Sequence, residues 1–203
     1  MGISFLIPFY SYIMKIICII AIVFLELSIS SCQFNGTLQG LYSYYRKVNR
    51  GNPDLFITIN DSIDFCEVKA SAVSKILLLN GKNLNKCIKK YKKSLVYIWS
   101  PNCKSQYCYS LEYLQKICNE VNIELFIVAE YYDMHYMSID YNLERPIIGI
   151  DTKYYKTNIT SKYLTKFISD LTDGIEISDR FIYFANGYFA KSFKSTDQIL
   201  ITE

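Results

Sequence analysis

Two cysteines, Cys103 and Cys108, stand where an apolar run gives way to a helical pattern, and thiol chemistry is what this position favours. The run Ser94 to Trp99 has the composition of a strand, and Pro101-Asn102 ends it. A thiolate at the start of a helix is stabilised by the free backbone amides and the helix dipole, which lower the pKa of the thiol. Cys103 is therefore the candidate nucleophile.

The helix expected after Cys103 carries an apolar stripe at spacings of 4, 3, 4 and 3. The stripe consists of Tyr107, Leu111, Leu114, Cys118 and Val121. If Cys108 lies on this helix, it is rotated by about 140° from Cys103 and displaced by about 7.5 Å along the axis. That separation exceeds disulfide reach unless the first turn unwinds. We therefore expect Cys103 to react mainly through mixed disulfides with another molecule.

The remaining cysteines and the single histidine add no second reaction centre. Cys118 lies on the apolar stripe and is expected in the core, whereas Cys66 and Cys87 could pair in an oxidising compartment. A lone His135 does not support a structural zinc site. The sequence has no phosphate-cradling glycine loop and no paired-carboxylate motif, so we predict neither a metal nor a cofactor.

The elements that must position the two candidate cysteines alternate between strand and helix. A strand at 94–99, a helix and a strand at 123–129 form a parallel crossover unit. An edge hairpin is expected within 55–68. A short apolar run at 76–79 is closed by Asn80-Gly81. Further predicted elements are a helix over 84–91, a strand at 147–150, a helix at 161–171 and a hairpin at 180–192 around Asn186-Gly187. This order predicts an α/β fold with a mixed sheet flanked by helices.

Two segments resemble the thioredoxin-like family. Tyr97-Ile98-Trp99-Ser100-Pro101-Asn102-Cys103 resembles its active-site approach, and Phe181 to Ala190 resembles its closing hairpin. The resemblance covers roughly residues 75 to 195. It implies thiol–disulfide exchange on exported proteins, with Cys103 as the reactive residue.

The sequence departs from the thioredoxin pattern at two positions. Gln106 stands where the family has its second cysteine, and Asp179 and Arg180 stand where it has a cis-proline, unless Pro146 takes that role from a shifted position. These departures favour a non-catalytic lipoprotein that uses the same fold for binding or structure. The enzymatic and the non-catalytic interpretations both stay open.

A second resemblance is to peroxiredoxins of the bacterioferritin-comigratory type, which pair a peroxidatic cysteine with a resolving cysteine five residues on. Cys103 and Cys108 have that spacing. This resemblance implies a thiol peroxidase. However, Val96 occupies the position of a proline that those proteins carry seven residues before the reactive cysteine.

The N-terminal segment has the pattern of an export signal. Ile16 to Leu25 is an apolar run of ten residues after Lys15, too short for a helix to span a bilayer, which takes about 20 residues. Ile29-Ser30-Ser31-Cys32 then resembles a bacterial lipoprotein box, which predicts a lipid on Cys32. Two alternatives stay open, namely cleavage after Ser30 and an uncleaved anchor over 3–25. Translation could begin at Met1 or at Met14.

Composition agrees with one exported globular domain. Hydrophobic residues make up 51% and charged residues 20% of the 203, which is enough apolar surface for a sizeable core. The net charge of +3 is weak, and the basic cluster at 89–93 is typical of a solvated helix end, so nucleic acid is not an expected partner. We predict a signal peptide at 1–31, a tether at 32–54 and a thioredoxin-like domain at 55–203. The expected location is the cell envelope, on a membrane and facing the periplasm or the exterior.

Overall fold

The computed structural model describes residues 14–17, 19–20, 40–57, 64–70, 75–103 and 108–199. The chain divides into two units, Met1–Thr37 and Leu38–Glu203. Within the first unit, the described residues 14–17 and 19–20 are helical. Cys32 and most of the predicted signal segment lie outside the described residues. No helix in the described ranges combines the length and the apolar character that crossing a membrane requires.

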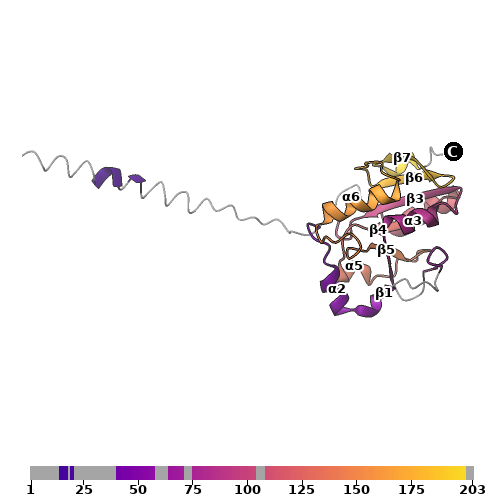
Figure 1. The fold of residues 1–203 in the computed structure, drawn as a ribbon, viewed down its shortest axis with the longest axis horizontal. Helices are drawn as coiled ribbons and strands as arrows, with labels where there is room; N and C mark the ends of the chain where they lie inside the picture. Colours follow the sequence, from indigo (N-terminus) through magenta and orange to yellow (C-terminus); the bar gives the residue numbers. More distant parts are fainter. Residues whose placement is uncertain are drawn as a thin grey trace, which may run out of the picture. The chain divides into compact units, whose positions relative to one another are not determined.

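The second unit is an α/β domain built on one mixed sheet, which confirms the predicted fold class (Figure 1). Its elements are α2 (Tyr45–Gly51), η1 (Pro53–Leu55), β1 (Phe56–Ile57), β2 (Ile76–Leu79), α3 (Gly81–Ile88), β3 (Lys93–Trp99), α4 (Leu111–Glu120), β4 (Glu124–Ala129), α5 (Met134–Met137), β5 (Ile147–Ile150), α6 (Thr160–Leu171), β6 (Phe181–Ala185), β7 (Tyr188–Phe193) and η2 (Thr196–Gln198).

The seven strands of the described sheet run in the order β1-β2-β5-β4-β3-β6-β7. The first five in this order are parallel, whereas β6 pairs antiparallel with β3 and with β7. β3 and β4 are in register from Ser94↔Glu124 to Trp99↔Ala129, so they are the closely joined parallel pair of the crossover unit. The arrangement is compatible with a thioredoxin-like fold.

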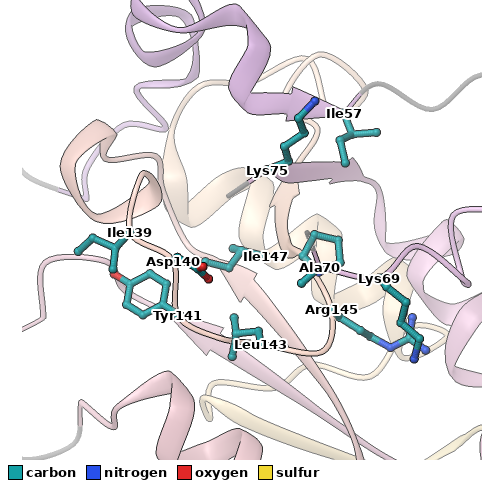
Figure 2. A pocket seen from close by; sticks show the side chains of 11 residues that line it. Ile57, Lys69, Ala70, Lys75, Ile139, Asp140, Tyr141, Leu143, Arg145 and Ile147 are labelled. Carbon is teal, nitrogen blue, oxygen red and sulfur yellow. The ribbon is translucent and has the colours of Figure 1, made fainter. Parts of the chain in front are cut away.

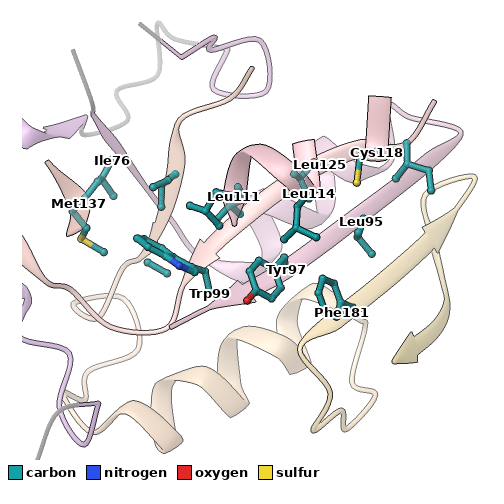
Figure 3. Close-up of a cluster of buried hydrophobic side chains, with 14 of the residues drawn as sticks. Ile76, Leu95, Tyr97, Trp99, Leu111, Leu114, Cys118, Leu125, Met137 and Phe181 are labelled. Atoms are coloured by element: carbon teal, nitrogen blue, oxygen red, sulfur yellow. The ribbon is translucent and has the colours of Figure 1, made fainter. Parts of the chain in front are cut away.

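Successive side chains of β3 point to opposite faces of the sheet, so the core has two layers. Leu95, Tyr97 and Trp99 face the layer covered by α4, where Leu111 and Leu114 pack (Figure 3). The intervening residues of β3 face the layer covered by α3 and α6. Because β3 is buried on both faces, its sequence is almost continuously apolar.

Local chemistry fixes several element boundaries. The side chain of Asn80 accepts a hydrogen bond from the backbone N of Asn83 at 2.9 Å and begins α3. Asn186 and Gly187 have φ values of 52° and 81°, the positive values that a type I′ turn requires at both central positions. The predicted tight hairpin between β6 and β7 is therefore present.

Two predicted segments differ from the structure. The predicted tether at 32–54 contains α2, which buries Tyr45 and Val48 in the core of the domain. The prediction of an edge hairpin within 55–68 is wrong for its second strand, because residues 64–68 contain turns and bends and no strand. β1 instead pairs parallel with β2.

Candidate functional site

The structure joins Cys103 and Cys108 in a disulfide, with their Cα atoms 5.8 Å apart. This corrects the expectation that the two thiols lie beyond each other's reach. The expectation assumed a helix from Cys103 onward, but α4 begins only at Leu111, where the side chain of Ser110 accepts a hydrogen bond from the backbone N of Tyr113 at 3.4 Å. Both cysteines therefore lie between β3 and α4. Tyr107, the first residue of the predicted stripe, lies outside the described residues.

The two cysteines also differ from the prediction in their relation to the helix. Cys103 follows a turn in which its backbone N donates to the carbonyl of Ser100 at 3.1 Å, and α4 begins eight residues further on, at Leu111. Cys108 stands two residues before Ser110, the N-cap of α4. In sequence, Cys108 is therefore the nearer of the two to the N-terminus of α4, where backbone amides and the helix dipole stabilise negative charge.

Tyrosine side chains hold the residue that precedes Cys103. The backbone N of Asn102 donates to the hydroxyl of Tyr131 at 3.1 Å, and the hydroxyl of Tyr136 donates to Oδ1 of Asn102 at 3.1 Å. Both tyrosines belong to the segment that follows β4. Asp133 caps α5 by accepting from the backbone N of His135 at 3.0 Å and of Tyr136 at 3.3 Å, which orients the second tyrosine.

Tyr109 is fixed at the other end of the disulfide, next to Cys108. Its hydroxyl is hydrogen-bonded to Ser195 Oγ and accepts from the backbone N of Thr196, each at 3.4 Å, and its ring meets Phe181 edge-on. These hydrogen bonds, first the one with Ser195, lower the pKa of Tyr109. Both ends of the disulfide are thus attached to segments distant in sequence.

Trp99 is part of the core and not of an exposed surface. It is 6% exposed, and its ring packs edge-on against Tyr141, with ring centroids 5.6 Å apart. Its carbonyl accepts from the backbone N of Glu130 at 2.7 Å. Trp99 therefore supports the end of β3 from within the core and does not itself present a surface to a substrate (Figure 3).

Asp179 and Arg180 stand where the thioredoxin pattern has its cis-proline. The carbonyl of Arg180 accepts from the backbone N of Ile98 at 2.8 Å, and its Nη1 donates to the carbonyl of Ile98 at 3.0 Å. Its Nη2 lies 3.0 Å from the carboxylate of Glu130. The described backbone contains no cis peptide bond. Pro146 lies at the amino end of β5, whereas Cys103 follows the carboxyl end of β3, so Pro146 does not take the missing role.

The other described cysteines are buried. Cys66 and Cys87 form a disulfide with Cα atoms 5.1 Å apart and are 4% and 1% exposed, a pairing that the sequence left open. Cys118 is a free thiol in the core, and burial raises its pKa to about 12. Cys103 and Cys108 are the described cysteines that are partly exposed.

A recess beside β1, β2 and β5 is lined by three cationic residues but by no cysteine that could carry out thiol chemistry (Figure 2). Arg145 is buried there, and it donates to the carboxylate of Glu124, the hydroxyl of Tyr91 and, at 2.6 Å, the carbonyl of Cys66. Its guanidinium also lies over the rings of Tyr91 and Phe126. Arg145 therefore binds the segment around Cys66 to the sheet, and its donors are used within the fold.

The described residues contain no group of three or more His, Cys, Asp and Glu side chains that could hold a metal ion. His135 lies on α5 with an exposed side chain, and its ring meets that of Tyr136 edge-on. Sequence reasoning misses the tyrosines near Cys103. In a chain with 19 tyrosines, residue type marks none of them, and only the fold brings Tyr131 and Tyr136 to Asn102.

The chain matches no protein-family model, no curated protein and no solved structure.

Proposed function

We propose that this protein is a thioredoxin-like thiol–disulfide exchange protein of the cell envelope, held at a membrane by a lipid on Cys32. The observation that carries the proposal is the partly exposed disulfide between Cys103 and Cys108, whose first cysteine comes four residues after the end of β3, a central strand of the sheet. Exposed disulfides are the labile ones, whereas a fully buried bond such as Cys66–Cys87 is shielded from an attacking thiolate.

The exchange begins when a thiolate of a partner protein attacks Sγ of Cys103. The Cys103–Cys108 bond breaks, Cys108 leaves as a thiolate and takes a proton from water, and a mixed disulfide joins Cys103 to the partner. A second partner thiolate then attacks the partner's own sulfur, and Cys103 leaves. The partner is oxidised to a disulfide, and Cys103 and Cys108 are reduced to two thiols.

The direction of attack follows from the position of α4. A thiol with a lower pKa is the better leaving group, and Cys108 is the cysteine that stands nearer in sequence to the N-cap of that helix. Attack on Cys103 with departure of Cys108 is therefore favoured over the reverse. This keeps Cys103 as the residue that is linked to the partner.

The test is to trap that linkage. Cys108→Ser should accumulate a mixed disulfide at Cys103 with glutathione disulfide, detected by mass spectrometry, whereas Cys103→Ser should accumulate less because its remaining thiol is the leaving group. Reduced glutathione should open Cys103–Cys108 in the folded wild-type protein and leave Cys66–Cys87 intact. If both bonds resist equally, the protein does not exchange disulfides, and the non-catalytic interpretation stands.

That second candidate, a non-catalytic binding or structural lipoprotein, is favoured by Gln106 in the position of the second cysteine and by Asp179 in the position of the cis-proline. The peroxidase alternative is separated by its substrate. Reduced protein that consumes hydrogen peroxide faster than it reduces glutathione disulfide would favour a thiol peroxidase using Cys103 and Cys108.

The anchor is tested by Cys32→Ala and cell fractionation. Loss of the protein from the detergent phase is the expected result. Unchanged partitioning would remove the lipid on Cys32 and favour an uncleaved anchor.

A further inference from the structure

The chain enters the domain next to the Cys103–Cys108 disulfide. The carbonyl of Leu41 accepts from the backbone N of Thr160 at 3.0 Å, and the backbone N of Ser43 donates to the carbonyl of Asn158 at 2.9 Å. The carbonyl of Ser43 also accepts from the backbone N of Tyr132 at 2.8 Å. The entry segment, residues 40–43, is therefore fixed to the domain by its backbone.

One side chain spans the distance from this entry segment to the residue before Cys103. The ring of Tyr131 lies against Gly40, where an added Cβ would stand 3.3 Å from Cε1 of the ring. The hydroxyl of the same tyrosine accepts from the backbone N of Asn102 at 3.1 Å. A single tyrosine thus separates the entry segment from the chain that leads into the disulfide.

The length of chain before the entry segment limits how far the disulfide can lie from a lipid. Gly40 is the eighth residue after Cys32, and eight residues cannot span more than about 29 Å even when fully extended. Leu41 and Tyr42, in the entry segment, are 45% and 41% exposed. Exposed apolar and aromatic side chains of this kind suit the boundary between lipid headgroups and water.

We infer that the Cys103–Cys108 disulfide works close to the bilayer surface and that its partners are thiol proteins which are themselves membrane-bound, with cysteines within a few nanometres of the membrane. The inference rests on the proposed exchange function and on the lipid at Cys32. Confinement of both partners to one surface raises their effective concentration, and a soluble thiol protein lacks this advantage.

The experiment uses the lipidated full-length Cys108→Ser protein in vesicles of phosphatidylethanolamine and phosphatidylglycerol. The probe is a short peptide with one cysteine carried as a mixed disulfide with thionitrobenzoate, made with and without a dipalmitoyl anchor. When Cys103 attacks the peptide sulfur, thionitrobenzoate leaves and its absorbance gives the rate. Cys103→Ser/Cys108→Ser is the blank, because Cys118 is buried and Cys66 and Cys87 are bonded to each other.

The variant that tests the geometry inserts a Gly/Ser segment of about 30 residues after Thr37. This longer tether should lower the rate with the anchored probe about tenfold, because effective concentration falls roughly as the −3/2 power of linker length. The matched control inserts the same segment after Gly174, where the structure has no atom within 4 Å of an added Cβ. That insertion should leave the rate unchanged.

The outcomes separate the two proposals. A faster reaction with the anchored probe that depends on tether length supports the inference. Equal rates with the two probes would overturn the inference while leaving exchange by Cys103 in place. A rate with the anchored probe that is unchanged by the insertion after Thr37 would do the same. No thionitrobenzoate release from either probe would overturn the exchange function itself.

Discussion

The two disulfides are expected to contribute unequally to stability, and replacing each pair by alanine measures the difference. Cys66 and Cys87 are 21 residues apart in sequence, and Cys103 and Cys108 are 5 apart. The loss of loop-closure entropy in the unfolded chain then corresponds to about 3.3 kcal/mol for the first bond and about 2.1 kcal/mol for the second at 25 °C. Cys66→Ala/Cys87→Ala should therefore lower the free energy of unfolding by about 1.2 kcal/mol more than Cys103→Ala/Cys108→Ala.

The difference in unfolding free energy is expected to exceed this entropic value, because the Cys66–Cys87 bond also fixes the carbonyl of Cys66, which accepts a hydrogen bond from a buried side chain. The carbonyl of Cys66 accepts from buried Arg145 at 2.6 Å, and a loosened segment would leave that donor without its partner. The assay is urea unfolding followed by the fluorescence of Trp99, the single tryptophan, which is buried in the native state. Equal losses in the two variants, or a larger loss for the Cys103 pair, would refute the assignment of Cys66–Cys87 as the structural bond.

Three further predictions concern single positions. Gly187→Val should lower the free energy of unfolding by about 2 kcal/mol, because φ is 81° and an added Cβ would stand 2.8 Å from the backbone of Lys89. Gly174→Val, where φ is 99° but the space is open, should lower it less, and equal losses of the two variants in urea unfolding would contradict the clash. Tyr136→Phe removes a hydroxyl that donates to Asn102, the residue before Cys103. Glutathione should therefore reduce the Cys103–Cys108 disulfide several-fold faster, with little change in melting temperature, and an unchanged rate would show that this tyrosine does not act on the site. Because the pKa of Cys118 is raised to about 12, its thiol should stay protonated and unalkylated by iodoacetamide at about pH 8.5 until urea unfolds the domain; labelling of the native protein would show that the thiol is accessible.

Sequence patterns predicted the elements whose character is local. The apolar runs at 76–79 and 147–150 are strands with those bounds, and the Asn186-Gly187 turn has the predicted backbone. The sheet order could not be obtained in the same way. β5 pairs with β2 and β4, and the pairing of strands so distant in sequence leaves no trace in hydrophobic periodicity.

The candidate site shows the same limit. The pattern of Leu111, Leu114 and Cys118 correctly placed these side chains in the core, but periodicity alone does not fix where a helix begins. Ser110 accepts a hydrogen bond from the first turn, so that α4 starts at Leu111 and not at Cys103. That shift converts two thiols that were expected to be out of reach into a bonded pair.

The stability of β3 should also determine how much of the domain unfolds when the segment with the Cys103–Cys108 disulfide opens locally. Six of its seven residues are buried, and it is bonded to β4 on one side and β6 on the other. Its amides should be among the slowest in the protein to exchange with deuterium, whereas the amides of Cys103 and Cys108, which lie outside any strand or helix, should exchange much sooner. The Cys103–Cys108 bond thus follows a strand that is paired on both sides, so that the local opening and closing of the bond need not involve unfolding of that strand.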